Sequence, residues 1–359
     1  MRAHLRTAFI LALTLGLLAF FFRNADLGQV WVEMRAANLA WIAVAALVNF
    51  VTYPLRTLRW QYLLAPVGRV RFWPALSATI IGFAASVILP ARAGELLRPY
   101  MLARRERLSA TSAFATVVLE RVLDLVTVLL LLGTFLLTVG PGRGPFDEDR
   151  LRAVRGGGLA AALAALGLLV LFGVLAGHPD WLVRLVHRLE RRLPVTAGRV
   201  APLVQRFTAG LATVRQPRRL LTALALSLPL WLTIAAGIWV TAHAFHMTVP
   251  YVGSFLIVAI LVIGVAVPTP GAIGGFHAAF EVAVTSFYGV PADRAVGGGI
   301  VLHAVSFLPV VLVGAALMVH EGLSLGRVRA MAAHAPDDAD PAADPDGEAA
   351  AVGEAEGIR

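Results

Sequence analysis

The residues with the clearest potential for chemistry are charged side chains placed inside apolar segments. Arg92, Glu95 and Arg98 follow Pro90 closely, with Gly94 between them. Guanidinium groups bind phosphate oxygens in a bidentate fashion, and a helix opening at Gly94 would offer an anion its free N–H groups. The segment therefore predicts a site for a phosphate-bearing lipid head group, in which Glu95 pairs with an arginine when no ligand is bound. A purely structural Glu–Arg lock is the alternative interpretation.

A second charged cluster lies in the middle of the apolar stretch 112–139. Glu120 and Asp124 are four residues apart and share one helix face, and Arg121 precedes Asp124 by three residues. A charged side chain at membrane depth costs roughly 2.5–3.5 kcal/mol on insertion scales, so this face must meet protein or water. We expect these residues to form ion pairs, with each other or with an arginine of the first cluster, or to relay a proton.

A Pro-Gly segment, 268–271, interrupts another apolar stretch and is followed by Gly274 and Gly275. Proline cannot continue a helix and glycine permits close backbone approach, so we expect an unwound turn that acts as a gate. His277 and Glu281 share one helix face, but a third zinc ligand is not visible, so we expect no metal. The residues assigned to broken helices or gates are Pro90, Pro268, Pro270, Gly271, Gly274, Gly275, His277 and Glu281.

Arg56 and Arg59, followed by Trp60, come where the apolar stretch 39–58 gives way to a basic loop. Basic and aromatic residues gather at membrane–water boundaries, so we expect an interfacial anchor here. The alternative is the mouth of a path for lipid head groups. The sequence has no P-loop, dinucleotide-binding glycine motif or nucleophile elbow, so we expect no catalytic residue, no cofactor and no ATP-driven transport by this chain alone.

Composition places the chain among membrane proteins. Of its 359 residues, 58% are hydrophobic and only 15% are charged, whereas soluble domains are about half apolar and a quarter charged. The chain has no cysteine, which excludes disulfides and cysteine metal sites. Its net charge of +9 comes from arginine-rich loops beside apolar stretches, which favours contact with anionic lipid over nucleic acid.

The apolar stretches predict an all-α polytopic membrane protein with about six full spans. Two further stretches, broken at Pro90 and Pro268, predict re-entrant helical hairpins, or eight spans if both cross the membrane. Basic loops then place both termini in the cytoplasm of a bacterial inner membrane. The two halves contain the same elements in opposite orientation, an inverted repeat typical of transporters; eight ordinary spans with prolines at bends are the alternative. The full-length apolar stretches are 5–22, 39–58, 112–139, 157–177, 220–244 and 295–319.

The chain divides into a membrane domain and an acidic tail. We expect the helical transmembrane domain to cover residues 1–325. Within it, 181–216 has apolar residues at helical spacing opposite a row of arginines, which predicts a basic amphipathic segment at the cytoplasmic interface. The segment 330–359 is rich in Ala, Asp, Glu and Pro and predicts a disordered tail.

The charged clusters resemble those of the lysylphosphatidylglycerol synthase transmembrane-domain family of flippase-like membrane proteins. The matching segments are 56–60 (Arg-Thr-Leu-Arg-Trp), 90–98, 120–124 and 268–275, in an order that covers most of residues 5–320. The resemblance implies a helical domain that handles phospholipid or polyprenyl-lipid substrates. Full-length members add a soluble domain that transfers an aminoacyl group from tRNA; this chain ends soon after the last expected span, so we expect no such domain.

The chain departs from the family pattern at two positions. His277 stands where the resemblance implies an acidic residue, and His303 where it implies arginine. We expect a protein that moves an anionic phospholipid or polyprenyl-phosphate lipid between leaflets and is itself not an enzyme, with membrane lipids as partners. The alternative is a membrane subunit that modifies lipid head groups together with a separate enzyme. The residues assigned to head-group binding are Arg56, Arg59, Arg92, Gly94, Glu95 and Arg98.

Overall fold

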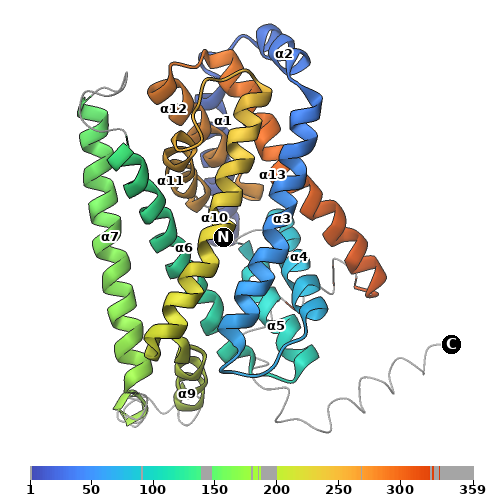
Figure 1. Ribbon diagram of the computed structural model, residues 1–359. Helices are drawn as coiled ribbons and strands as arrows, with labels where there is room; N and C mark the ends of the chain where they lie inside the picture. Colours follow the sequence, from blue (N-terminus) through green and yellow to red (C-terminus); the bar gives the residue numbers. More distant parts are fainter. Residues whose placement is uncertain are drawn as a thin grey trace, which may run out of the picture.

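Every described element of the computed structural model is a helix (Figure 1), so the predicted polytopic helical membrane fold is confirmed. The model describes residues 2–89, 92–138, 148–178, 181–184, 186, 200–267, 269–323, 326 and 331, with side chains from residue 12 onward. The helices are α1 (Arg2–Phe22), α2 (Leu27–Ala36), α3 (Leu39–Leu64), α4 (Phe72–Ile88), α5 (Gly94–Glu106), α6 (Ala110–Thr138), α7 (Glu148–Gly177), α9 (Val200–Gly210), η3 (Ala212–Arg215), α10 (Pro217–Ala244), α11 (Gly253–Ala266), η4 (Pro270–Ala272), α12 (Gly275–Tyr288) and α13 (Ala292–His320).

Local sequence explains where several helices begin. The Asp26 carboxylate accepts a hydrogen bond from the Gly28 N–H at 2.7 Å, which caps α2. The Asn38 side chain caps α3 in the same way, accepting from the Ala40 N–H at 3.0 Å. These side chains satisfy N–H groups that have no partner in the first helical turn. Pro217 opens α10, where its missing N–H does no harm.

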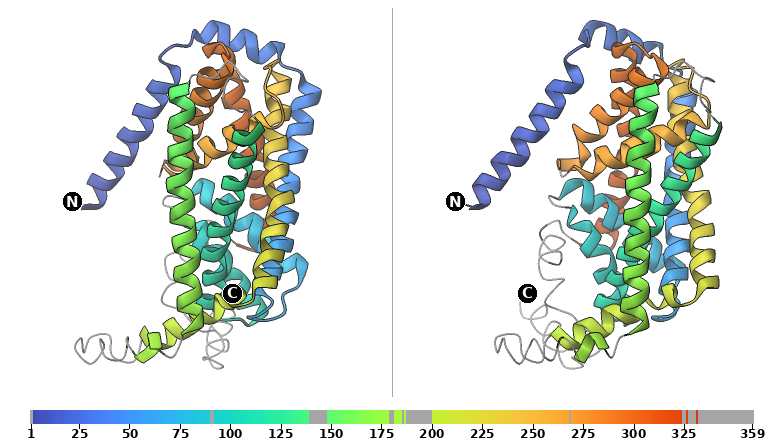
Figure 2. Two further views of the ribbon diagram at one scale, coloured as in Figure 1. Left: turned by 60° about the vertical axis from the view of Figure 1, so that its left-hand side comes forward. Right: turned by 90° about the vertical axis from the view of Figure 1, so that its left-hand side faces the viewer.

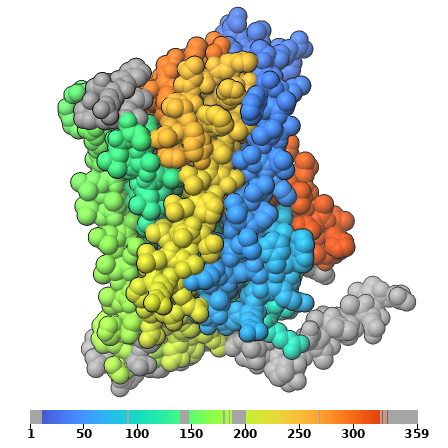
Figure 3. Space-filling model, in the orientation of Figure 1, coloured from blue at the N-terminus to red at the C-terminus, as the bar shows by residue number. Residues whose placement is uncertain are grey.

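Four helices are long and apolar enough, by length and composition, to cross a membrane: α3, α7, α10 and α13. The 29-residue α6 carries Glu120, Arg121 and Asp124 near its middle. Helix α7 stands along one edge of the bundle (Figure 3), with Leu159 and Leu163 among its many exposed apolar side chains. Such a continuous apolar face suits contact with lipid chains. Helix α1 leans away from the bundle (Figure 2).

Two short helical hairpins occupy opposite ends of the bundle, with α4–α5 in the lower half and α11–α12 in the upper half of Figure 1. Each is held closed by glycine. A methyl group on Gly94 would lie 1.9 Å from the Gly82 carbonyl oxygen, and one on Gly275 would lie 2.3 Å from the Gly264 carbonyl oxygen. Only glycine allows backbones to approach this closely.

The turns of the two hairpins meet inside the bundle. The Arg92 guanidinium, in the turn between α4 and α5, donates a hydrogen bond to the Val265 carbonyl at the end of α11. In the turn of the other hairpin, Gly271 has a positive φ of 59°, a conformation that glycine adopts without strain. His303 of α13 lies with Nε2 2.8 Å from the Gly271 carbonyl oxygen, so Nε2 is the donor. Pro90 and Pro268 lie outside the described residues.

The same order of elements occurs twice along the chain. A long helix, a second long helix, a short hairpin and a further long helix occur first as α1, α3, α4–α5 and α6, and then as α7, α10, α11–α12 and α13. The hairpins face opposite ends of the bundle (Figure 1), as the expected inverted repeat requires. Only 181–184, 186 and 200–216 of the expected amphipathic segment are described, and of the acidic tail only Met331.

Candidate functional site

Arg59 joins three helices in the interior of the bundle. Its side chain is fully buried, with Nη2 2.9 Å from Oε1 of Glu120 and Nη1 2.6 Å from Oδ1 of Asp124, both on α6. Nη1 also donates to the Ser227 hydroxyl of α10 at 2.9 Å. The Trp231 indole N–H donates to the same Asp124 oxygen at 2.9 Å. Because both partners lie out of contact with water, this ion pair fixes α3, α6 and α10 against one another.

Arg98 of α5 also pairs with the carboxylate of Glu120. Its Nη1 lies 3.2 Å from Oε2 of Glu120, and its guanidinium stacks 3.8 Å above the Trp60 ring. The Trp60 indole N–H in turn donates to the Thr116 hydroxyl at 3.0 Å. Glu120 therefore holds an arginine of the first cluster, as one of the sequence interpretations required. This arrangement fits the structural lock.

The expected interfacial anchor at 56–60 is wrong. The prediction ended the helix near residue 58, but α3 continues to Leu64, so Arg56, Arg59 and Trp60 lie inside the helix. Trp60 and Arg59 are fully buried between helices, so neither side chain is exposed as an interfacial anchor would be. The charge on Arg59 misled the sequence-based reading, because the two carboxylates that pair with it come from a helix about sixty residues further along the chain.

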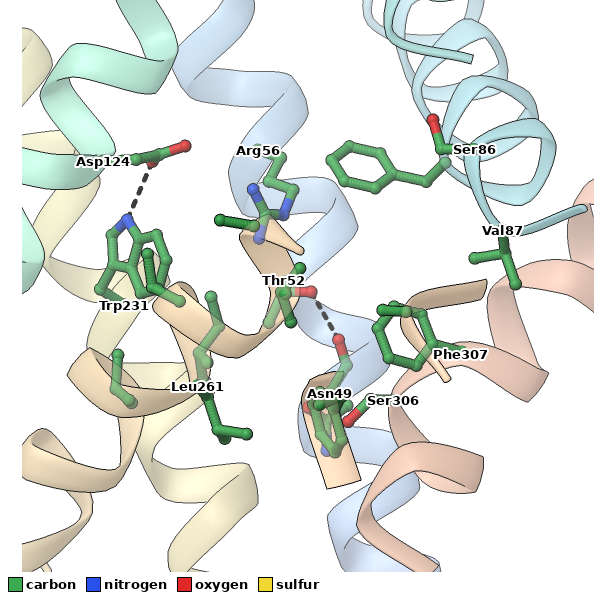
Figure 4. Close-up of a pocket in the computed structure, with 18 of the residues that line it drawn as sticks. Asn49, Thr52, Arg56, Ser86, Val87, Asp124, Trp231, Leu261, Ser306 and Phe307 are labelled. Carbon is green, nitrogen blue, oxygen red and sulfur yellow. Dashed lines mark hydrogen bonds between the residues drawn. The ribbon is translucent and has the colours of Figure 1, made fainter. Parts of the chain in front are cut away.

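A cavity of about 370 Å³ lies beside this ion-pair network (Figure 4). Its charged wall is formed by Arg56, Arg92, Glu95, Arg121 and Asp124. Its opposite wall is apolar and comes from α11 and α13; the residues include Leu261, Val262, Val265 and Phe307. A compartment that is charged on one side and apolar on the other is suited to an amphipathic ligand. Neither Arg59 nor Arg98 lines it.

Arg56 is a lining arginine that forms no ion pair with the described residues. Its Nη1 atom is buried and has no hydrogen-bond partner among the described residues, and its guanidinium lies 4.9 Å from the Phe83 ring centroid. Asn49 and Thr52 lie on the same face of α3 and also line the cavity (Figure 4). Asn49, Thr52 and Arg56 recur at helical spacing within an apolar helix, so the sequence analysis could have predicted a polar face here but did not. Nothing in the sequence pointed to Trp231.

Arg121 completes the charged wall. Its Nη1 lies 3.4 Å from Oδ2 of Asp124, the i, i+3 pair expected from the sequence, and its Nη2 lies 3.4 Å from Glu120. Its side chain is 39% exposed, while its Nε is buried without a hydrogen-bond partner among the described residues. Arg92 and Glu95 lie at the rim, with Nη1 of Arg92 3.8 Å from Oε1 of Glu95. Gly94 does not line this cavity and packs against α4 instead.

His277 and His303 form a stacked pair near the second hairpin turn, with ring centroids 4.7 Å apart. The Gly274 N–H donates to Nδ1 of His277 at 3.4 Å. Glu281 is 4% exposed, and its Oε2 has no hydrogen-bond partner in the described part of the chain. The described residues contain no group of three or more His, Asp or Glu placed to hold a metal ion. Phe276 packs edge-on against both histidines and also lines the cavity.

The sequence is similar to one family model and to proteins of two organisms. The family model described as the lysylphosphatidylglycerol synthase TM region matches residues 7–314. A Haloferax volcanii protein named glycosyltransferase AglD is 26% identical over 344 residues, which cover 88% of this chain and 54% of that protein. A UPF0104 membrane protein of Methanothermobacter thermautotrophicus is 24% identical over 324 residues, which cover 83% of this chain and 90% of that protein. The chain thus spans about half the length of the first relative.

Proposed function

The chain belongs to the family of lysylphosphatidylglycerol synthase transmembrane regions, and from this premise we propose that it binds an anionic phospholipid or polyprenyl-phosphate lipid and moves its head group between leaflets. The family and its apolar helices make it a multi-pass membrane protein. Family membership supports a role in lipid modification or transport. The cavity supports the further proposal that the protein moves the lipid between leaflets.

The observation that carries the proposal is the uncompensated positive charge around the cavity. Five guanidinium groups and three carboxylates lie at or directly behind its charged wall, an excess of two positive charges. Charge buried without a partner is unfavourable, and an anion in the cavity would neutralise it. The positive groups are Arg56, Arg59, Arg92, Arg98 and Arg121, and the negative groups are Glu95, Glu120 and Asp124.

The position of the cavity suits movement of a head group across the membrane. Its wall includes Arg92, beside the first hairpin, and Gly271, in the turn of the second. Two broken hairpins that enter from opposite ends and meet at a ligand site are an arrangement used by transporters. In this proposal both hairpins are re-entrant, and each closes the cavity toward one side of the membrane. The apolar wall formed by α11 would contact the hydrocarbon chains of the lipid.

The orientation follows from the arginines near the first hairpin. Arg69 and Arg71 precede α4, and Arg105 and Arg107 lie at the end of α5. Positively charged loops stay on the cytoplasmic side. We therefore place this end of the bundle in the cytoplasm of a bacterial inner membrane, and we propose the same side for both termini. The membrane domain of this proposal covers 1–325, followed by the acidic tail 330–359.

A reconstituted system tests this function. Purified protein is placed in liposomes that contain a fluorescent anionic lipid, and transfer between leaflets is followed by quenching from outside. We expect transfer well above that of empty liposomes, and a loss of at least tenfold in Arg56→Gln. Arg152→Gln is the matched control, because Arg152 is 75% exposed on α7 and remote from the cavity lining. Equal transfer by Arg56→Gln and the wild type would refute the proposed role of the cavity.

A second candidate function is a membrane subunit of a system that modifies lipid head groups. The relative named as a glycosyltransferase favours it, since this chain matches about half of that protein. In this case a separate catalytic protein would act on a lipid held in the cavity. Stable co-purification of a transferase, together with lipid binding but no transfer between leaflets, would support this second candidate over the first.

A further inference from the structure

The charges around the cavity also indicate which head groups it prefers. Resting on the proposed function, we infer that the cavity takes a phosphoryl group with two negative charges, as in a lipid phosphomonoester or a lipid diphosphate. A phosphodiester lipid carries one negative charge on its phosphate, and a zwitterionic lipid carries none in total. The cavity would discriminate against both.

The arginines at the cavity carry two positive charges that no carboxylate among the described residues compensates. Glu120 and Asp124 are shared by three arginines: Arg59 contacts both, Arg98 contacts Glu120, and Arg121 contacts both. Three positive groups therefore meet two negative ones. Arg92 and Glu95 balance each other at the rim.

Arg56 supplies the second excess charge, because it has no ion pair among the described residues. The described lining residues of α10, α11 and α13 include no charged side chain. One monoanion would leave one of these buried positive charges without a partner. Two negative charges on one phosphoryl group would match the site.

Two of the arginines that line the cavity have guanidinium N–H groups that could donate hydrogen bonds to a phosphoryl group. Nη1 of Arg56 and Nε of Arg121 are buried and have no hydrogen-bond partner in the part of the chain that the structure describes, and both residues line the same cavity from neighbouring helices. Guanidinium groups bind phosphate oxygens strongly when water is excluded. The apolar wall formed by Leu261 and Val262 favours a phosphoryl group attached to a hydrocarbon chain over free phosphate.

Equilibrium binding in detergent, followed by native mass spectrometry, tests the inference. Phosphatidic acid and phosphatidylglycerol with identical acyl chains compete for the purified protein. At pH 8 the phosphomonoester is a dianion, since its second pKa is about 6. We expect phosphatidic acid to bind at least tenfold tighter at pH 8, with most of that preference lost at pH 5. The described lining residues include no histidine, and their two carboxylates, Glu95 and Asp124, pair with Arg92 and Arg121, so we attribute the expected pH change to the ligand.

Two variants and one soluble competitor sharpen the test. Arg56→Gln should reduce the preference for phosphatidic acid at least tenfold while changing phosphatidylglycerol affinity less than threefold, and Arg152→Gln should change neither. Inorganic phosphate should compete only at concentrations at least a hundredfold higher than phosphatidic acid. Competition at equal concentrations would contradict a lipid-borne ligand. Equal binding of the two lipids at pH 8 would overturn the inference but leave the proposed function standing, and binding of neither would overturn both.

Discussion

Arg59 of α3 and Glu120 of α6 form an ion pair at 2.9 Å in which both side chains are fully buried. The pair connects the two helices that carry the charged wall of the cavity. Because Glu120 also receives Arg98 and Arg121, one carboxylate organises three arginines from three helices. Arg56 lies on the same helix as Arg59, three residues earlier, and lines the cavity.

Removing the charge of Glu120 should destabilise the protein strongly. Glu120→Gln leaves Arg59 and Arg98 with reduced compensation in the interior, and breaking a buried pair from one side costs about 3–5 kcal/mol. We expect a clearly lower apparent Tm in detergent, measured by following intrinsic fluorescence during heating. Asp149→Asn is the control, since Asp149 is 82% exposed and its pair with Arg152 contributes little. An unchanged Tm for Glu120→Gln would show that the buried network is not structural.

A methyl group at Gly94 should open the first hairpin. Its carbon would lie 1.9 Å from the Gly82 carbonyl oxygen, so α5 would have to move away from α4. Strong overpacking of this kind costs about 1–3 kcal/mol or more, and we expect Gly94→Ala to lower both the yield of folded protein and the apparent Tm. Gly167→Ala on α7 meets nothing within 4 Å and should have no such effect. Equal behaviour of the two variants would contradict the described packing.

Removing the charge of Arg56 should affect ligand binding but not folding. Its Nη1 has no hydrogen-bond partner among the described residues, so Arg56→Gln leaves no carboxylate unpaired. We expect the apparent Tm of the lipid-free variant to equal or exceed that of the wild type, because excess positive charge is removed. Added anionic lipid should raise the Tm of the wild type more than that of the variant. A large loss of stability without lipid would mean that Arg56 holds the fold together.

The sequence revealed the helices and the two interruptions because both are local properties. Apolar length predicts spans, and proline and glycine near 90 and 268 predict breaks. The pair of Arg121 and Asp124 was also predictable, since three residues of one helix separate them. The i, i+4 spacing likewise placed Glu120 and Asp124 on one face, and both are buried inside the bundle.

The roles of individual arginines depend on tertiary contacts that the sequence does not encode locally. Arg56 and Arg59 are one helical turn apart and looked equivalent, yet one faces a cavity and the other is locked between Glu120 and Asp124. Arg98 looked like a ligand for phosphate, but it stacks on Trp60 and does not line the main cavity. Whether it contacts a ligand in another state stays a prediction.

The most direct test of a lipid site in the cavity is covalent capture of the ligand. An anionic lipid with a photoreactive group near its phosphate is incorporated with the protein into liposomes and illuminated, and modified residues are mapped by mass spectrometry. We predict adducts on cavity-lining residues such as Thr52, Phe83 and Leu261, and fewer of them in Arg56→Gln. Adducts confined to exposed apolar positions of α7, such as Leu159 and Leu163, would contradict a lipid site inside the bundle.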